Sequence, residues 1–149
     1  MNITTQKVYE LLSNLRDEIN RKFRQYGYNR FQFLDVDEVV LENPKDPNEV
    51  QKRNELYSII EKLDDITYVL DYLEKPVLKS GVLRKNANGR YELEGYEFTS
   101  GSDIEILIVD PEGEEASYWE HTSVEHDGDD YYAVYRHTCL DGLEARIRR

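Results

Sequence analysis

The sequence predicts an α+β protein with two parts, an antiparallel two-helix hairpin over residues 1–79 and a small antiparallel β-barrel over residues 80–149. In the first part, apolar residues recur at spacings of three and four, which is the period of a helix with one buried face. In the second part, short apolar runs are separated by turn residues about every 8 to 12 positions, which is typical of an SH3-like or OB-like barrel.

The first helix is predicted from an apolar stripe that is followed by a glycine. The members of the stripe are Val8, Leu11, Leu12, Leu15, Ile19 and Phe23. Thr4 or Thr5 is suited to cap the start, because a hydroxyl oxygen can accept a hydrogen bond from a free backbone N–H. Gly27 can adopt the left-handed conformation that ends a helix. Charged residues occupy the opposite face.

The second helix is predicted to begin at Asp46-Pro47-Asn48-Glu49, with Asp46 as the N-cap and Glu49 reaching back to a free N–H. Its apolar stripe consists of Val50, Leu56, Ile59, Ile60, Leu63, Ile66, Leu70 and Leu73. Pro76 ends it, because proline cannot continue a helix interior. Two long amphipathic helices are expected to pack antiparallel and to bury their stripes on each other.

The connection over residues 28–45 is apolar without a helix or strand period, and we interpret it as packed chain with a short strand or helical turn. Apolar surface that the two helices cannot bury on each other would pack on the barrel or form a homodimer through the helices. The periodicity alone leaves both alternatives open.

Short strands are predicted after Pro76, enough for the five or six strands of a small barrel. The segments are 81–85, 90–93, 96–98, 104–109, 118–125, 131–136 and 143–148. Asn88-Gly89 favours a tight hairpin turn between the first two. The last segment alternates strictly between polar and apolar residues, as a half-buried strand does.

The net charge of −12 is concentrated in the second part. Residues 1–79 carry 12 basic and 15 acidic residues, a net charge of −3, whereas residues 80–149 carry 7 and 16, a net charge of −9. Such a field repels phosphate backbones and argues against direct nucleic-acid binding. One alternative remains, weak nucleic-acid binding through the first helix. Its basic residues are Arg16, Arg21, Lys22, Arg24 and Arg30.

Cysteine usage and hydropathy predict a cytoplasmic protein without a membrane role. Cys139 is the single cysteine, so no intrachain disulfide can form. The sequence has no basic-plus-apolar leader and no long apolar run.

Catalytic motifs are absent from the sequence, and we expect neither an enzyme nor a cofactor. His137 and Cys139 are two residues apart and could form a nucleophile and base, but no oxyanion motif accompanies them. A set of possible metal ligands matches neither the calcium-loop nor a zinc spacing, so an exposed turn is expected there. This set is His121, His126, Asp127, Asp129 and Asp130.

Acidic and aromatic residues of the second part suit a protein partner, most simply a basic one. The candidate partner-binding residues are Glu112, Glu114, Glu115, Tyr118, Trp119, Asp127, Asp129, Asp130 and Tyr132. The carboxylates could imitate nucleic acid and occupy the basic groove of a nucleic-acid-binding enzyme. Alternatively, outward-facing acids such as Glu92, Glu94, Glu105 and Glu120 only keep the barrel soluble.

The aromatic residues support a further alternative, an SH3-like groove for a proline-rich or basic peptide. Tyrosine and tryptophan are favoured anchors at interfaces. The group consists of Tyr118, Tyr131, Tyr132 and Tyr135 around Trp119. At the C-terminus, Arg146, Arg148 and Arg149 form a small positive end that pairs with the acidic barrel or contacts a phosphate.

Several motifs of the second part resemble a small uncharacterised family. They are Gly81-Val82-Leu83, Asn88-Gly89-Arg90-Tyr91, Gly95 to Gly101, Ile104-Glu105-Ile106, Trp119, Tyr131-Tyr132 and Gly142 to Arg148. The family is domain of unknown function five-three-four-eight, met in Gram-positive bacteria and their phages and conjugative elements. The resemblance implies a compact barrel without catalytic residues. It also implies an accessory protein of a mobile element that acts on host or competitor machinery. Together with the acidic surface, this context predicts a protein that binds and modulates a basic host or defence protein.

Overall fold

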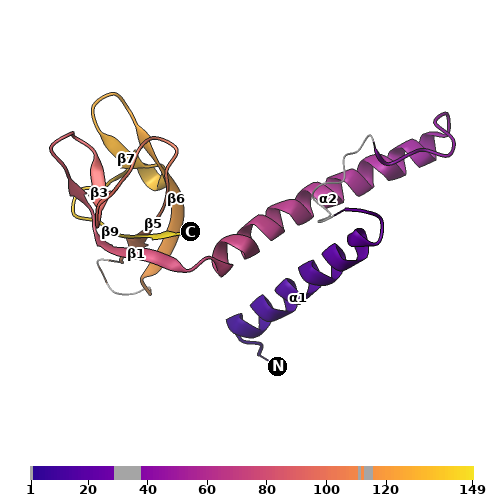
Figure 1. Cartoon of the computed structure of the whole chain (residues 1–149), viewed down its shortest axis with the longest axis horizontal. Helices are drawn as coiled ribbons and strands as arrows, with labels where there is room; N and C mark the ends of the chain where they lie inside the picture. The colour runs from indigo at the N-terminus through magenta and orange to yellow at the C-terminus, as the bar shows by residue number, and fades with distance from the viewer. Residues whose placement is uncertain (1, 29–37, 111, 113–115) are drawn as a thin grey trace. The chain divides into compact units, whose positions relative to one another are not determined.

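The structure is a computed structural model that describes residues 2–28, 38–110, 112 and 116–149. Two helices are followed by a mostly antiparallel β-sheet, which confirms the predicted α+β class (Figure 1). The chain divides into two compact units, Met1–Glu74 and Lys75–Arg149, called here the helical unit and the sheet unit. The sequence interpretation placed the division at 79/80, within the first strand of the sheet unit.

Helix α1 (Thr5–Arg24) begins and ends at the predicted signals. The Thr4 hydroxyl accepts a hydrogen bond from the backbone N–H of Lys7 at 3.2 Å, which satisfies one of the free donors of the first turn. After the helix, Gly27 has a φ of +90°. A side chain there would be strained, so glycine allows the chain to leave the helix.

Helix α2 (Pro47–Glu74) begins at the predicted cap, where Asp46 accepts the N–H of Asn48 at 2.9 Å. Glu49 reaches further back than a capping box requires. Its carboxylate accepts the N–H groups of Glu42 at 2.5 Å and Asn43 at 2.8 Å, which fixes the incoming chain on the first turn. Neither described helix is sufficiently long and apolar to cross a membrane.

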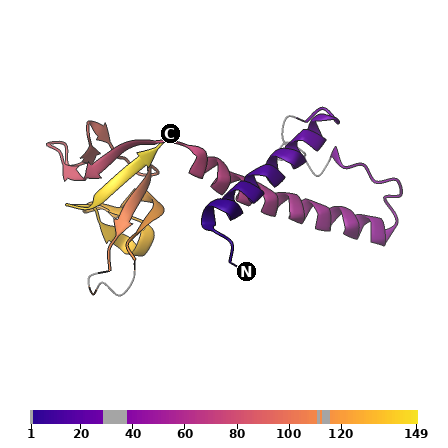
Figure 2. The same cartoon turned by 90° about the horizontal axis from the view of Figure 1, so that it is seen from below.

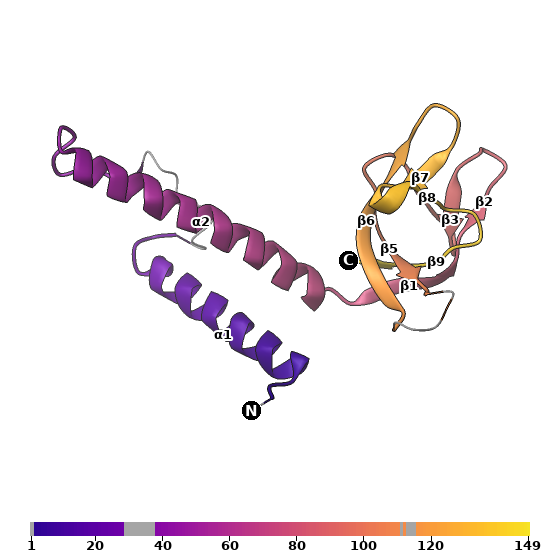
Figure 3. The same ribbon diagram turned by 180° about the vertical axis from the view of Figure 1, so that it is seen from behind.

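The sheet unit contains one six-stranded and one three-stranded sheet, with every pairing antiparallel (Figure 3). The larger sheet has the order β1-β9-β5-β6-β7-β8 and the smaller has the order β2-β3-β4. The strands are β1 (Val77–Val82), β2 (Arg84–Lys85), β3 (Tyr91–Leu93), β4 (Tyr96–Glu97), β5 (Asp103–Ile108), β6 (Tyr118–His126), β7 (Tyr131–Ala133), β8 (Thr138–Cys139) and β9 (Glu144–Arg148). Among the described strands, β1 and β8 pair on one side only, so the predicted closed barrel is not found.

Both sheets enclose a single apolar core. Its buried members are Leu83, Tyr91, Leu93, Phe98, Ile104, Ile106, Val124, Ala133, Leu140, Ala145 and Ile147. Along β9 the buried Ala145 and Ile147 alternate with more exposed residues, which confirms the predicted alternation of the last strand. Burial of these side chains is the main stabilising contribution to the unit.

Two predicted strands are shorter than expected. Segment 81–85 is divided at Leu83, because its backbone leaves the larger sheet and bonds to Gly142 and Leu143 instead. Segment 131–136 ends at Ala133 and continues into the short 3-10 turn η3 (Tyr135–His137). Arg136 and His137 have φ values of +52° and +50°, which no strand can contain.

Candidate functional site

The helical unit carries a wide apolar surface, called here the apolar face. Its eight side chains are each 39–53% exposed: Val8, Leu11, Leu12, Leu15, Ile59, Ile66, Val69 and Leu73. By contrast, the buried apolar side chains that the structure describes in this unit are Leu70 and Tyr72. The predicted stripes are therefore present on both helices, but the eight side chains of the apolar face keep about half of their surface in contact with solvent.

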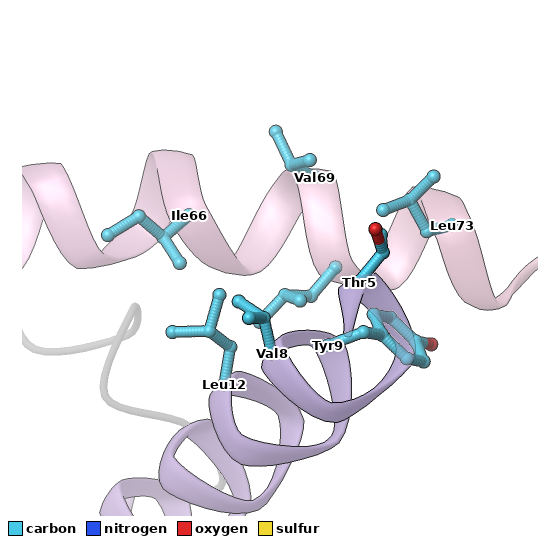
Figure 4. A pocket seen from close by; sticks show the side chains of 8 residues that line it. Thr5, Val8, Tyr9, Leu12, Ile66, Val69 and Leu73 are labelled. Atoms are coloured by element: carbon cyan, nitrogen blue, oxygen red, sulfur yellow. The ribbon is translucent and has the colours of Figure 1, made fainter. Parts of the chain in front are cut away.

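A cavity of about 340 Å³ lies within the apolar face, between the two helices. It is lined by Thr5, Val8, Tyr9, Leu12, Ile66, Val69, Leu70 and Leu73. Figure 4 shows Leu12 and Ile66 pointing toward one another across the gap between the ribbons. The lining is almost entirely hydrocarbon, so this cavity suits an apolar side chain rather than a polar substrate.

Arg16 joins the two helices beside this cavity. Its guanidinium donates to Asp71 at 2.9 Å and to Glu74 at 2.7 Å, and its side chain is only 10% exposed. The hydrogen bond to Glu74 is the main cause that raises the pKa of Arg16 above its ordinary value. These ion pairs hold α1 against the last turns of α2, whose residues also line the cavity. Figure 2 shows the ribbons of the two helices crossing in this view.

Two carboxylates of the predicted acidic surface, Asp127 and Asp130, are engaged in the turn that contains them. Asp127 accepts the N–H groups of Asp130 and Asp129, and these bonds lower its pKa. Asp130 binds Lys85 at 2.8 Å and accepts the N–H of Tyr131, which lowers its pKa as well. Asp129 is exposed. Two of these three carboxylates are thus structural parts of the β6–β7 turn.

The Tyr91 hydroxyl donates to the same turn, at 3.1 Å from Asp130. Burial, followed by this carboxylate, raises the pKa of Tyr91 from its ordinary value of 10.0 to about 12. A raised pKa stabilises the protein below pH 10, and the contribution is lost as the pH rises to about 12. We therefore expect the stability advantage of wild type over Tyr91→Phe to shrink across this range, as measured by urea unfolding. Tyr26→Phe, at a tyrosine 80% exposed, should show no such change.

Of the three predicted glutamates, Glu112 is the one that the structure describes. Glu112 is exposed, and its N–H donates to Asp110 at 3.0 Å. Glu114 and Glu115 lie outside the described residues.

The predicted aromatic group takes part in several contacts, the first of which is the edge-to-face contact of Tyr131 with His126, with ring centroids 4.6 Å apart. Tyr118 shares a hydroxyl hydrogen bond of 2.9 Å with Tyr135. Tyr132 stacks on His137, with ring centroids 3.9 Å apart. The Trp119 ring lies under Arg146, with the guanidinium carbon 4.3 Å from the ring centroid, and this arrangement favours cation–π attraction. The aromatic side chains therefore take part in contacts within the sheet unit.

Sequence reasoning missed a buried charge cluster on the outer side of the larger sheet. Glu105 was expected to face solvent, but it is only 4% exposed. Its carboxylate accepts from Arg146 and from Arg148, the latter at 3.1 Å, so the C-terminal arginines pair with an acid of the sheet as predicted. Arg149 lies over the Tyr96 ring. Glu105 lies opposite Arg146 in the pairing of β5 with β9. This contact could not be predicted because the sequence alone does not show which strands pair.

Metal-ligating and nucleophilic residues are dispersed in the described part of the chain. There, no group of three or more His, Cys, Asp or Glu side chains is arranged to hold a metal ion. Cys139 is free and exposed on β8. His137 contacts Asp127 at 3.4 Å and Tyr132 through its ring.

Residues 81–147, in the C-terminal part of the chain, match the protein family described as Domain of unknown function (DUF5348). This match covers most of the sheet unit and none of the helical unit. No curated protein and no solved structure matches the chain.

Proposed function

We propose that this protein is a non-catalytic protein-interaction module whose helical unit binds another polypeptide through the apolar face. The observation that carries this proposal is the apolar face, in which eight Leu, Ile and Val side chains of two neighbouring helices are about half-exposed. Contiguous apolar area of this kind is rare on monomers and marks sites of association. The cavity between Leu12 and Ile66 would receive an apolar anchor from the bound chain.

An acidic surface that imitates nucleic acid is less well supported by the geometry. Mimicry needs carboxylates that are presented to a basic groove in the partner. Asp127 and Asp130 instead accept backbone N–H groups of their own turn, and Asp130 is neutralised by Lys85. We therefore place partner recognition on the helices rather than on this turn.

The proposed architecture is an antiparallel helical hairpin joined to an SH3-like sheet unit. The cavity is lined by the first turns of α1 and the last turns of α2, as helices running in opposite directions would arrange them. Two small antiparallel sheets around one core support the SH3-like assignment.

A comparison of tagged variants in cell lysate tests the proposed function. Val69→Glu places a charge in the apolar face, and Leu78→Glu places the same charge on β1, where Leu78 is 55% exposed. We expect mass spectrometry to show bound polypeptides, including untagged copies of the chain, that wild type and Leu78→Glu retain and Val69→Glu loses. A charge desolvated in an apolar interface weakens binding strongly. Equal recovery by all three proteins would contradict the proposal.

A further inference from the structure

We propose that the polypeptide bound at the apolar face is a second copy of this chain, so that the protein is a two-fold homodimer joined through α1 and α2. This inference rests on the proposed function and names the partner of the same surface. A two-fold interface uses one patch on both copies, so the patch must complement itself in shape, apolar area and charge.

The apolar area is the first argument for a second copy. Two helices alone enclose little space, and the helical unit buries few apolar side chains while the eight of the apolar face remain about half-exposed. At roughly 75 Å² of remaining surface each, these eight offer on the order of 600 Å² per copy, near the ~800 Å² that a stable interface buries on each partner once polar neighbours are included. Two copies would complete a four-helix bundle, the arrangement that buries such stripes.

The extent of the apolar face agrees with such a bundle. On α1 it runs from Val8 to Leu15, and on α2 it runs from Ile59 to Leu73. These spans correspond to about 11 Å and about 21 Å of helix. A single short peptide would cover one helix or the cavity, whereas a helix pair covers both helices at once.

Charge is the second argument, because the two helices carry opposite net charges. Helix α1 has five basic and three acidic residues, a net charge of +2, and α2 has three basic and seven acidic residues, a net charge of −4. A two-fold axis that places α1 of one copy beside α2 of the other creates two contacts between oppositely charged helices. The alternative pairing of α2 with α2 brings two strongly acidic helices together and is disfavoured.

Sedimentation equilibrium of the full chain over a range of concentrations tests the inference. We expect wild type to have a measured mass of twice the 17.7 kDa of one chain, and the Leu12→Glu/Val69→Glu variant to have the mass of one chain. The dissociation constant should rise on the order of 100-fold or more, since four charges enter the apolar interface of the dimer. Leu78→Glu makes an apolar-to-charged change at an exposed position of the sheet unit and should remain dimeric.

A second variant keeps the apolar face intact and tests the charge argument. Arg21→Glu/Lys22→Glu changes two exposed residues and converts the net charge of α1 from +2 to −2. We expect this variant to keep its helical circular dichroism and to dimerise on the order of tenfold more weakly, because α1 would then repel α2 of the second copy.

The outcomes separate this inference from the proposed function. Wild type at 17.7 kDa at every concentration, or an unchanged dimer in Leu12→Glu/Val69→Glu, would overturn the homodimer. If wild type were monomeric while Val69→Glu still lost a different polypeptide in lysate, the homodimer would fail and the proposed function would stand. A monomer with equal recovery by every variant would overturn both.

Discussion

Replacing Glu105 by alanine is expected to destabilise the sheet unit by about 3–5 kcal/mol, the usual cost of removing one partner from a buried ion cluster. Arg146 and Arg148 would lose the carboxylate that both contact. Their side chains are only 20% and 15% exposed, so water cannot fully replace it. Arg146 would keep the Trp119 ring and Arg148 would keep the Lys75 carbonyl, but neither supplies a negative charge.

Urea unfolding of the full chain, followed by tryptophan fluorescence, measures this change. Trp119 is the only tryptophan and lies against Arg146, so its emission reports on the sheet unit. Glu144→Ala removes an exposed carboxylate from the same strand as the arginines and should change stability by less than about 0.5 kcal/mol. If Glu105→Ala cost no more than this control, the cluster would behave as a solvated surface network.

Phe98→Ala is expected to be comparably destabilising, at about 3–5 kcal/mol, through the loss of a fully buried ring. Phe98 packs edge to face on Tyr96 at 4.9 Å, and its N–H donates to the carbonyl of Tyr91. It therefore fills the core where the smaller sheet meets the larger one. Truncation would leave a cavity at this junction, because the surrounding backbone is fixed by strand pairing.

Phe98→Leu separates the effect of the cavity from that of the aromatic ring. Leucine keeps most of the apolar volume but loses the ring contact with Tyr96, so a cost below about 1.5 kcal/mol is expected in the same unfolding experiment. Equal costs for the alanine and leucine variants would show that ring geometry, rather than filled volume, is the larger contribution.

The helices could be predicted well because their signals are local. The starts of the helices depend on residues in or next to the first turn, namely Thr4, Asp46 and Pro47. The apolar stripes follow from the helical period alone. Most strands were also placed, but β8 and the first four residues of β1 were not predicted. The division at Leu83 was missed because it depends on bonds to residues about sixty positions later. The turn at Arg136 and His137 was missed because neither residue is of a type that signals a positive φ.

The candidate site was less predictable because it depends on what the fold leaves uncovered. Periodicity identified the stripes that contain Leu12 and Ile66, but it could not show how much of their area the two helices would bury. The acidic turn had the opposite outcome, since Asp127 and Asp130 looked like free surface charge and found partners only in the folded turn. Glu105 was assigned to solvent for the same reason.

The position of Glu105 between two arginines also restricts the register in which β5 and β9 pair and the substitutions that these three positions can accept. A shift of one residue in β9 would turn Arg146 and Arg148 into the core and Ala145 and Ile147 out of it, so the cluster selects one register. Loss of Glu105 alone leaves two partly buried arginines without their carboxylate, whereas apolar residues at positions 105, 146 and 148 together could be tolerated. Evolution at this part of the sheet should therefore proceed by concerted replacement of the three residues rather than by single steps.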